Sequence, residues 1–319
     1  MADSRSKRLE SYWKTIRKLE VKRKSRIFSL IHTGDQDNHI CSPTFQAVLS
    51  ERKHIGDIDT LEVILHSGGG DPDIAYQVVR FFRRHCKRFH VIVPYTAKSA
   101  ATLMCLGADA IYMAELADLG PIDVQIIDPL KKGAKRISPL DEFKSTEFLR
   151  DYAVEVFDFI TNLVLERSGM SVNEALRLAI PFTTGIMRPL YEKLDPLEIG
   201  EYKRALAIGE QYANRLLALT RNPRREEIVS ALLYKYPSHG FAIDAVEARA
   251  LGLPVHALNP AQEDSLLEAL KVVLSNGESV YGFPKLPPPR ATQKPAAKQK
   301  PAAKQKQPAA GGQPKLVAS

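Results

Sequence analysis

The stretches TLEVILHSGGG (residues 60–70) and FHVIVPYTAKSAATLMCLGAD (residues 89–109) share one pattern, and that pattern indicates the fold class. Each begins with a β-rich apolar run and ends in a tight turn, Ser67-Gly68-Gly69-Gly70 in the first and Thr96-Ala97-Lys98-Ser99 in the second. A segment with helical periodicity follows each turn, over residues 73–85 and 100–109. Repetition of strand, turn and helix predicts an α/β fold whose parallel sheet is covered by helices on both faces.

The same alternation continues on either side of these stretches. Further strands are predicted over residues 26–32 and 110–114, and a helix is predicted over residues 5–24. Beyond Asp128 the pattern becomes helical, with predicted helices over residues 139–168, 172–180, 197–220 and 224–235 and with breaks at Pro181, Pro189 and Pro196. The chain then returns through a short helix and strand (246–255) to a final helix, about 260–276.

These segments predict three parts of the chain. Residues 1–25 form a basic N-terminal helix, and residues 26–283 form one α/β domain that receives a helical insertion at about 129–235. Residues 284–319 form a Lys/Pro/Ala-rich tail, which we expect to be disordered because it has too few apolar residues to bury.

The formal net charge of +8 is concentrated in that tail, which has eight Lys and Arg residues and no acidic residue. The remaining chain is neutral overall, so the composition does not favour a basic body built for nucleic acid. The tail is predicted to be a solubilising extension, or to contact acidic partners weakly. The three cysteines show no CxxC spacing, so neither a disulfide framework nor a metal site is predicted. A charged N-terminus without a long apolar run predicts a cytoplasmic protein with no membrane segment.

The two turns contain the candidate catalytic residues. Three successive glycines, Gly68, Gly69 and Gly70, allow a backbone with φ > 0 that presents N–H groups to a developing oxyanion. Ser99 begins a helix of small residues, where its hydroxyl can stand clear as a nucleophile and the amide of Ala100 can act as a second oxyanion donor. A serine in this position is also commonly a helix N-cap, and both interpretations remain open from the residues alone.

Several motifs in order resemble one known family. The sequence ILHSGGG, the nucleophile turn PYTAKSAATLM, the strand and loop GADAIYMAELADLGPIDVQ and the closing stretch HGFAIDAVEARALGLPV resemble the serine dehydrogenase proteinase family, which is related to signal peptide peptidase A and the Clp peptidase. The resemblance covers about residues 11–128 and 236–256, and Ala100-Ala101 replaces the usual Gly-Gly pair. It implies a ClpP/crotonase-like sheet of repeated β-β-α units, serine peptidase activity without a cofactor, a peptide or protein substrate, and a homo-oligomer.

A serine nucleophile needs a base, and two kinds are available. His239 lies in the loop before the closing motif, and the resemblance implies that Asp123 could orient it. Lysine is the base in signal peptide peptidase A, which makes Lys98, Lys144 and Lys203 alternatives. His66, beside the glycine turn, is a candidate for substrate contact.

Two other functions fit the same fold. Crotonase relatives bind acyl-CoA thioesters in the equivalent oxyanion hole, although the LGPID loop offers no obvious catalytic glutamate. The chain could also be a catalytically inactive oligomeric scaffold in which Ser99 is only a helix cap.

Overall fold

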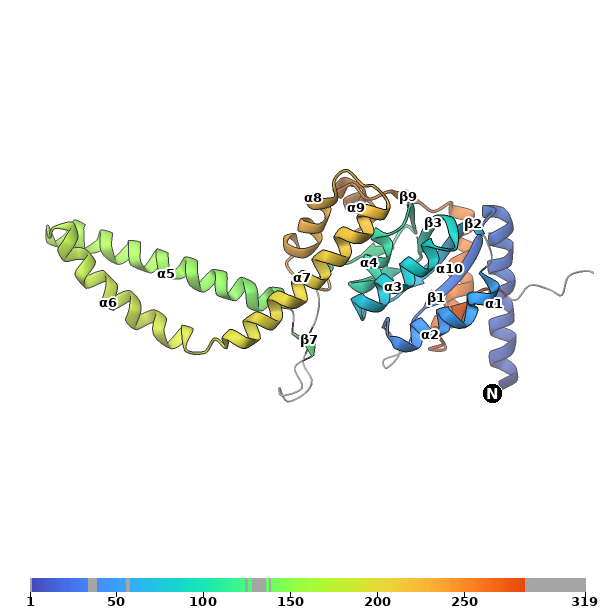
Figure 1. Cartoon of the computed structure of the whole chain (residues 1–319), viewed down its shortest axis with the longest axis horizontal. Coiled ribbons are helices and arrows are strands. Elements are labelled where there is room, and N and C mark those ends of the chain that lie inside the picture. Colours follow the sequence, from blue (N-terminus) through green and yellow to red (C-terminus); the bar gives the residue numbers. More distant parts are fainter. Residues whose placement is uncertain are drawn as a thin grey trace, which may run out of the picture. The chain divides into compact units, whose positions relative to one another are not determined.

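A six-stranded sheet in the order β10-β1-β2-β3-β5-β9 forms the centre of the fold (Figure 1). The strands β1 (Arg26–Ile31), β2 (Ile58–His66), β3 (Cys86–Val93), β5 (Ala110–Met113) and β9 (Val255–Ala257) are all parallel. The edge strand β10 (Val280–Gly282) pairs antiparallel with β1. Because helices cover both faces, β2 and β3 are rich in apolar side chains pointing to either side.

The computed structural model describes residues 2–33, 39–55, 58–123, 126–127, 136–137 and 139–284. These residues belong to one compact unit, Met1–Pro284. The predicted disordered tail, apart from Pro284, lies outside the described residues.

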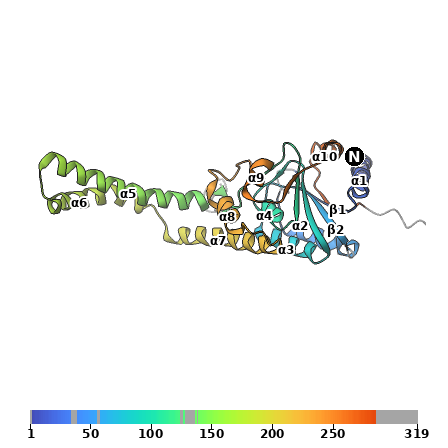
Figure 2. The ribbon, with the colours of Figure 1, turned by 90° about the horizontal axis from the view of Figure 1, so that it is seen from above.

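Two groups of helices cover the sheet (Figure 2). On one face lie α2 (Ser42–Ser50), α3 (Pro72–Arg83), α4 (Ala100–Leu106) and α7 (Pro196–Leu219), with buried side chains such as Phe82, Met104 and Leu216. On the other face lie α1 (Ala2–Arg23) and α10 (Pro260–Leu274), which pack Tyr12 and Leu266 towards Ile64 of β2. Among the helices that the structure describes, none combines the length and the apolar character that a bilayer crossing requires.

A layer of very short strands follows the main sheet at its carboxyl edge. Strand β4 (Thr96–Ala97) pairs with β6 (Asp118–Leu119), and Ser67 makes an isolated bridge to Ala97. Each of the main strands β2, β3 and β5 is thus followed by a short extended segment. This arrangement confirms the predicted α/β fold class with its β-β-α units and mainly parallel sheet.

The segment between β6 and β9 is mostly helical. After the small hairpin of β7 (Ile126–Ile127) and β8 (Arg136–Ile137), the chain forms α5 (Pro139–Ser168), α6 (Val172–Tyr191), α7, α8 (Arg225–Ser230), the π-helical turn η2 (Ala231–Lys235) and α9 (Ala245–Leu251). Elements β8 to η2 fall within residues 129–235, the region predicted as the insertion, whereas β7 precedes this region and α9 follows it. The division of the chain into domains remains a prediction.

One local prediction was wrong, and two short elements were not predicted. Pro181 was expected to end a helix at residue 180, but α6 continues through both Pro181 and Pro189 to Tyr191. Each proline removes one backbone hydrogen bond, and the packing of Ala175, Ala179 and Met187 in the buried part of α6 stabilises the helix around them. Helix α2 and the 3₁₀ turn η1 (Glu51–His54) were not predicted, because both are short elements with little periodicity.

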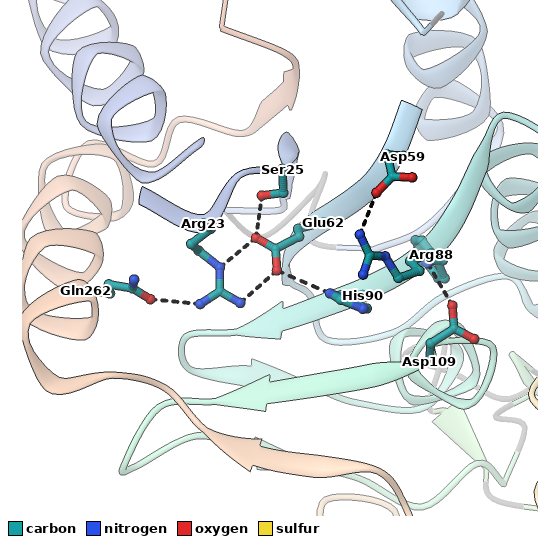
Figure 3. Close-up of polar contacts among 9 residues, drawn as sticks. Arg23, Ser25, Asp59, Glu62, Arg88, His90, Asp109 and Gln262 are labelled. Atoms are coloured by element: carbon teal, nitrogen blue, oxygen red, sulfur yellow. Dashed lines mark hydrogen bonds and ion pairs between the residues drawn. The ribbon is translucent and has the colours of Figure 1, made fainter. Parts of the chain in front are cut away.

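An ion pair on the α1 side of the sheet joins three elements (Figure 3). The guanidinium of Arg23, at the end of α1, donates to both carboxylate oxygens of Glu62 on β2, at 2.6 and 2.7 Å. Its third nitrogen donates to Gln262 of α10, and it stacks on the ring of Tyr112 at 4.2 Å. Burial raises the pKa of Glu62, but hydrogen bonds from His90, Arg23 and Ser25 and the charge of Arg23 outweigh burial and lower this pKa to about 2. This buried network of an ion pair and hydrogen bonds therefore attaches α1 and α10 to the sheet.

Candidate active site

Ser99 occupies a strained position at the start of α4. Its backbone has φ +50° and ψ −116°, a left-handed conformation that residues other than glycine rarely adopt. Although Ser99 is the N-cap residue of α4, its side chain makes no capping hydrogen bond. The hydroxyl is therefore not used as a helix cap, and a strained serine on a strand-to-helix turn is the geometry of a nucleophile elbow.

The glycine turn lies directly against this serine. A Cβ atom added to Gly69 would lie 2.8 Å from Ser99 Cβ and 3.4 Å from Ser99 Oγ. Gly69 and Gly70 have φ values of +116° and +135°, so only glycine fits both the backbone and the space. The two turns, about thirty residues apart in the sequence, thus meet at the carboxyl edge of the sheet.

Ile40 fixes the glycine turn from the other side, and sequence reasoning missed it. Its N–H donates to the carbonyl of Gly69 at 2.6 Å, and its carbonyl accepts from the N–H of Asp71 at 2.8 Å. A Cβ atom on Gly70 would lie 2.2 Å from that carbonyl oxygen. An isolated apolar residue between two loops gives no signal in the sequence that could have indicated this contact.

The amides available to an oxyanion differ from one another. The Gly69 N–H donates to the hydroxyl of Ser67 at 3.2 Å, so an oxyanion would have to replace that contact. The amide of Ala100 is at the first position of α4, where it has no carbonyl partner within the helix. Gly70, the next residue of the same turn, has a positive φ, a conformation that glycine adopts without strain.

His239 and Asp123 form a direct pair, although 116 residues separate them. His239 Nδ1 donates to Asp123 Oδ1 at 2.8 Å, and the carboxylate is only 1% exposed. This bond leaves His239 Nε2 as the proton-accepting nitrogen of a neutral imidazole. A histidine oriented by a buried carboxylate is the arrangement that serves as a general base in serine hydrolases.

Contacts of residues 119–122, which precede Asp123, link the chain on either side of His239 to the helix that follows Ser99. Leu119 and Ile243 form an antiparallel bridge with hydrogen bonds of 2.9 and 3.0 Å. The N–H of Ile122, next to Asp123, donates to the carbonyl of Leu232 at 3.1 Å. The hydroxyl of Thr102 in α4 lies 2.7 Å from the carbonyl oxygen of Ala97 and accepts from the N–H of Gly120 at 3.1 Å.

Lys98, the residue before Ser99, connects the segments around the site through its ammonium group. Its ammonium donates to Asp118 Oδ2 at 2.7 Å and to the carbonyls of Leu119 and Phe241 at 3.0 and 3.1 Å. These contacts join the nucleophile turn, β6 and the loop of His239. An ammonium whose three protons are held by an aspartate and two carbonyls has no lone pair for the Ser99 proton, which argues against Lys98 as the base.

The other two lysines lie in different environments. Lys144 Nζ donates to the carbonyl of Tyr236 at 3.4 Å, three residues before His239 in the chain. Lys203 is exposed on α7. The structure therefore brings Lys144, but not Lys203, to the neighbourhood of the predicted base.

His66 ends β2 beside the glycine turn. Its ring packs edge-on against Tyr95 at 5.8 Å, its Nδ1 is buried without a hydrogen-bond partner, and burial lowers its pKa. The neighbouring His32, which the sequence analysis did not single out, is fully buried, and burial together with the charges of His39 and His66 lowers its pKa to about 4. In both rings the lowered pKa favours the neutral imidazole over the cation.

Across the described ranges, no group of three or more His, Cys, Asp or Glu side chains is arranged to hold a metal ion. The three cysteines are free thiols, and burial raises the pKa of both Cys86 and Cys105.

Two curated relatives match part of the chain. Uncharacterized protein MJ0137 of Methanocaldococcus jannaschii is 28% identical over 172 residues, which are 49% of this chain and 60% of that protein. Uncharacterized protein MJ1495 of the same organism is 27% identical over 119 residues, 35% of this chain and 41% of that protein. The chain thus spans about three fifths and two fifths of the lengths of these relatives.

A solved structure of a mutant of the 1510-N membrane-bound stomatin-specific protease is 16% identical, with a TM-score of 0.29, and the match covers 48% of this chain and 68% of that chain. The family model of ClpP-like SDH-type serine proteinases matches residues 3–187, a range that contains the glycine turn, Ser99 and Asp123. The chain belongs to this family of ClpP-like serine proteinases.

Proposed function

We propose that the protein is a serine peptidase that cleaves a peptide or protein substrate through an acyl-enzyme on Ser99. The contact between Gly69 and Ser99 carries this proposal, because it puts a strained, uncapped serine against a glycine turn that can present amides to an oxyanion. Membership of a serine proteinase family supports the same reaction class.

In the first step, Ser99 Oγ attacks the carbonyl carbon of the substrate while His239 Nε2 takes the hydroxyl proton. The carbonyl oxygen becomes an oxyanion, which the amides of Ala100 and the turn Gly68-Gly69-Gly70 stabilise; each such donor typically lowers the barrier by about 3 kcal/mol. The imidazolium, stabilised by Asp123 at 2.8 Å, then gives its proton to the leaving amine as the C–N bond breaks. Water repeats the attack on the ester, regenerating Ser99 and releasing the acid.

Lys144 is the second candidate for the base. Its contact with the Tyr236 carbonyl places it beside the loop of His239, and a lysine that loses its proton by desolvation can perform the same transfer. The pair of His239 and Asp123 is the better supported assignment, because the histidine already has the partner that fixes its tautomer.

The proposal is tested by labelling the purified chain with a fluorophosphonate probe and mapping the labelled peptide. The parent should be labelled at Ser99, and Ser99→Ala should abolish labelling. The matched control Ser238→Ala changes an exposed serine next to His239 and should leave labelling unchanged. Labelling that persists in the Ser99 variant would remove the assignment, and tight acyl-CoA binding by an unlabelled parent would favour the crotonase-like alternative.

A further inference from the structure

Ile40 sets the direction of the peptide group between Gly69 and Gly70. Its N–H donates to the carbonyl of Gly69 at 2.6 Å, and its carbonyl accepts from the N–H of Asp71 at 2.8 Å. In a trans peptide the N–H points opposite to the carbonyl, so the Gly70 N–H points away from Ile40. Within the described residues this N–H has no hydrogen-bond partner, and it is therefore available to an oxyanion.

The position of Ile40 depends in turn on Thr44. The N–H of Cys41, the residue after Ile40, donates to Thr44 Oγ1 at 3.2 Å, and Cys41 Sγ lies 3.8 Å from the same oxygen. These contacts form the capping box at the start of α2. Ile40 and Thr44 are 0% and 1% exposed, so water does not replace a contact that is lost here.

His32 connects Thr44 to the main sheet. Its Nε2 lies 3.1 Å from Thr44 Oγ1, and its backbone N–H donates to the carbonyl of His66, the last residue of β2, at 2.9 Å. The ring is fully buried and packs edge-on against Tyr281 of β10 at 5.3 Å. The buried Nδ1 has no hydrogen-bond partner in the described part of the chain. This favours the tautomer whose proton lies on Nε2 and is donated to Thr44.

We propose that His32 and Thr44 are positioning residues for the oxyanion turn, which they hold through Ile40. The connection runs from the sheet through the imidazole, the threonine hydroxyl and the Ile40 backbone to the Gly70 amide. Capping of α2 does not by itself explain the buried imidazole, because Thr44 closes the capping box without it. The inference rests on the proposed function, since it assigns the connection to the stabilisation of an oxyanion.

Loss of this connection should act on the transition state more than on substrate binding. Gly69 and Gly70 have no side chains to restrain them, so the peptide group between them can rotate once Ile40 no longer holds it. The Gly70 amide is needed only when negative charge develops on the substrate oxygen. A misdirected amide should therefore lower kcat and leave KM almost unchanged.

Three variants of the full chain test the connection with a quenched fluorescent peptide. Thr44→Val removes the hydroxyl at nearly constant shape, His32→Ala removes the imidazole, and His32→Gln restores a terminal amide close to the place of Nε2. The first two should lower kcat roughly tenfold or more, and the third should recover most of the parent value. Thr60→Val changes another buried threonine, near the beginning of β2, and should retain the parent's kcat. Circular dichroism checks that each variant is folded, and Thr44→Val alone decides if His32→Ala does not fold.

Hydrogen exchange tests the turn without relying on activity. In fragments covering residues 68–74, the Asp71 amide should exchange roughly fivefold faster in Thr44→Val than in the parent, because its bond to Ile40 is weakened. Parent-like exchange would overturn the proposal, and so would faster exchange without a loss of kcat in an active parent. A His32→Gln variant as slow as His32→Ala would also contradict it.

The two measurements separate this proposal from the proposed function. A parent that cleaves no peptide and is not labelled at Ser99 would remove the proposed function. Exchange would then decide alone: a faster Asp71 amide in Thr44→Val would still support the connection that holds the turn, and an unchanged one would overturn it.

Discussion

Ser99 lies so close to Gly69 that a single added methyl group would separate them: a Cβ atom at residue 69 would approach Ser99 Cβ to 2.8 Å. The contact is between a nucleophile candidate with φ +50° and a glycine with φ +116°. Two residues in unusual backbone conformations thus hold each other in place. A site built in this way is sensitive to small displacements, because reaction requires the attacking oxygen and the amides to remain aligned.

Gly69→Ala should therefore remove activity while leaving most of the fold intact. The added methyl group would push Ser99 away and force alanine into a left-handed conformation, and a displacement of about 1 Å typically costs roughly a hundredfold in rate. Peptidase assays with a quenched fluorescent peptide measure the effect. Gly240→Ala is the matched control, since a Cβ atom there meets nothing within 4 Å although the residue adjoins His239. Equal activity of the two variants would show that the contact has no catalytic importance.

The orientation of His239 by Asp123 predicts a large effect of Asp123→Asn. An asparagine keeps the shape but can favour the wrong tautomer of the imidazole, so kcat should fall by roughly 10³–10⁴ with little change in KM. The pH–rate profile decides between the two bases. With His239 as the base, His239→Ala should lose the acidic limb of the pH–rate profile, and Lys144→Met should retain it. The reverse pattern would assign the base to Lys144.

Lys98 is predicted to position the site and not to transfer protons. Lys98→Met would leave Asp118 partly buried without its cation and would free the His239 loop, which should destabilise the protein by roughly 3 kcal/mol and lower kcat. The pH dependence of the remaining activity should keep the shape of the parent's profile. Lys203→Met, at an exposed position, should change neither stability nor activity. Loss of the acidic limb of the pH–rate profile in the Lys98 variant would contradict a purely positioning role.

The buried pair of Arg23 and Glu62 predicts how stability depends on acid. The pKa of Glu62 is lowered from 4.5 to about 2 in the folded chain, so its ionised form stabilises the fold above pH 4.5. This contribution is lost progressively as the pH falls from about 4.5 towards about 2. Urea unfolding at several pH values should show the loss in the parent.

Arg23→Met should change both the level and the slope of that curve. Leaving Glu62 buried without its cation should cost roughly 3–5 kcal/mol at neutral pH. Because the pKa of Glu62 then rises, the destabilisation between pH 4.5 and 2 should become smaller than in the parent. Arg88→Met is a suitable control, since its partner Asp59 lies on the surface and the pair is exposed. A parent and an Arg23 variant with parallel curves would remove the proposed role of the pair.

Local sequence patterns were enough to predict those parts of this protein whose conformation depends on residues close together in the chain. Continuous β-rich apolar runs in 60–66 and 89–95 indicated the strands, and small residues at Gly69 and after Ser99 indicated the turns, because strand propensity and turn conformation are local properties. The order of the motifs was sufficient to identify the family. The course of α6 shows the limit of local rules: proline alone predicted a break at Pro181, while packing against α5 stabilises a continuous helix.

Only the folded chain shows which distant residues meet, although the family resemblance had already indicated Asp123 as a partner of His239. The bond between His239 and Asp123 spans 116 positions, and Lys98 reaches the carbonyl of Phe241 across 143 positions. No periodicity links such residues, because their contact depends on how short strands, loops and the returning chain pack after the sheet has formed. The same packing distinguishes the three lysines that were candidates for the base. It holds the ammonium of Lys98 in an ion pair, exposes Lys203 on α7 and brings Lys144 to the loop of His239.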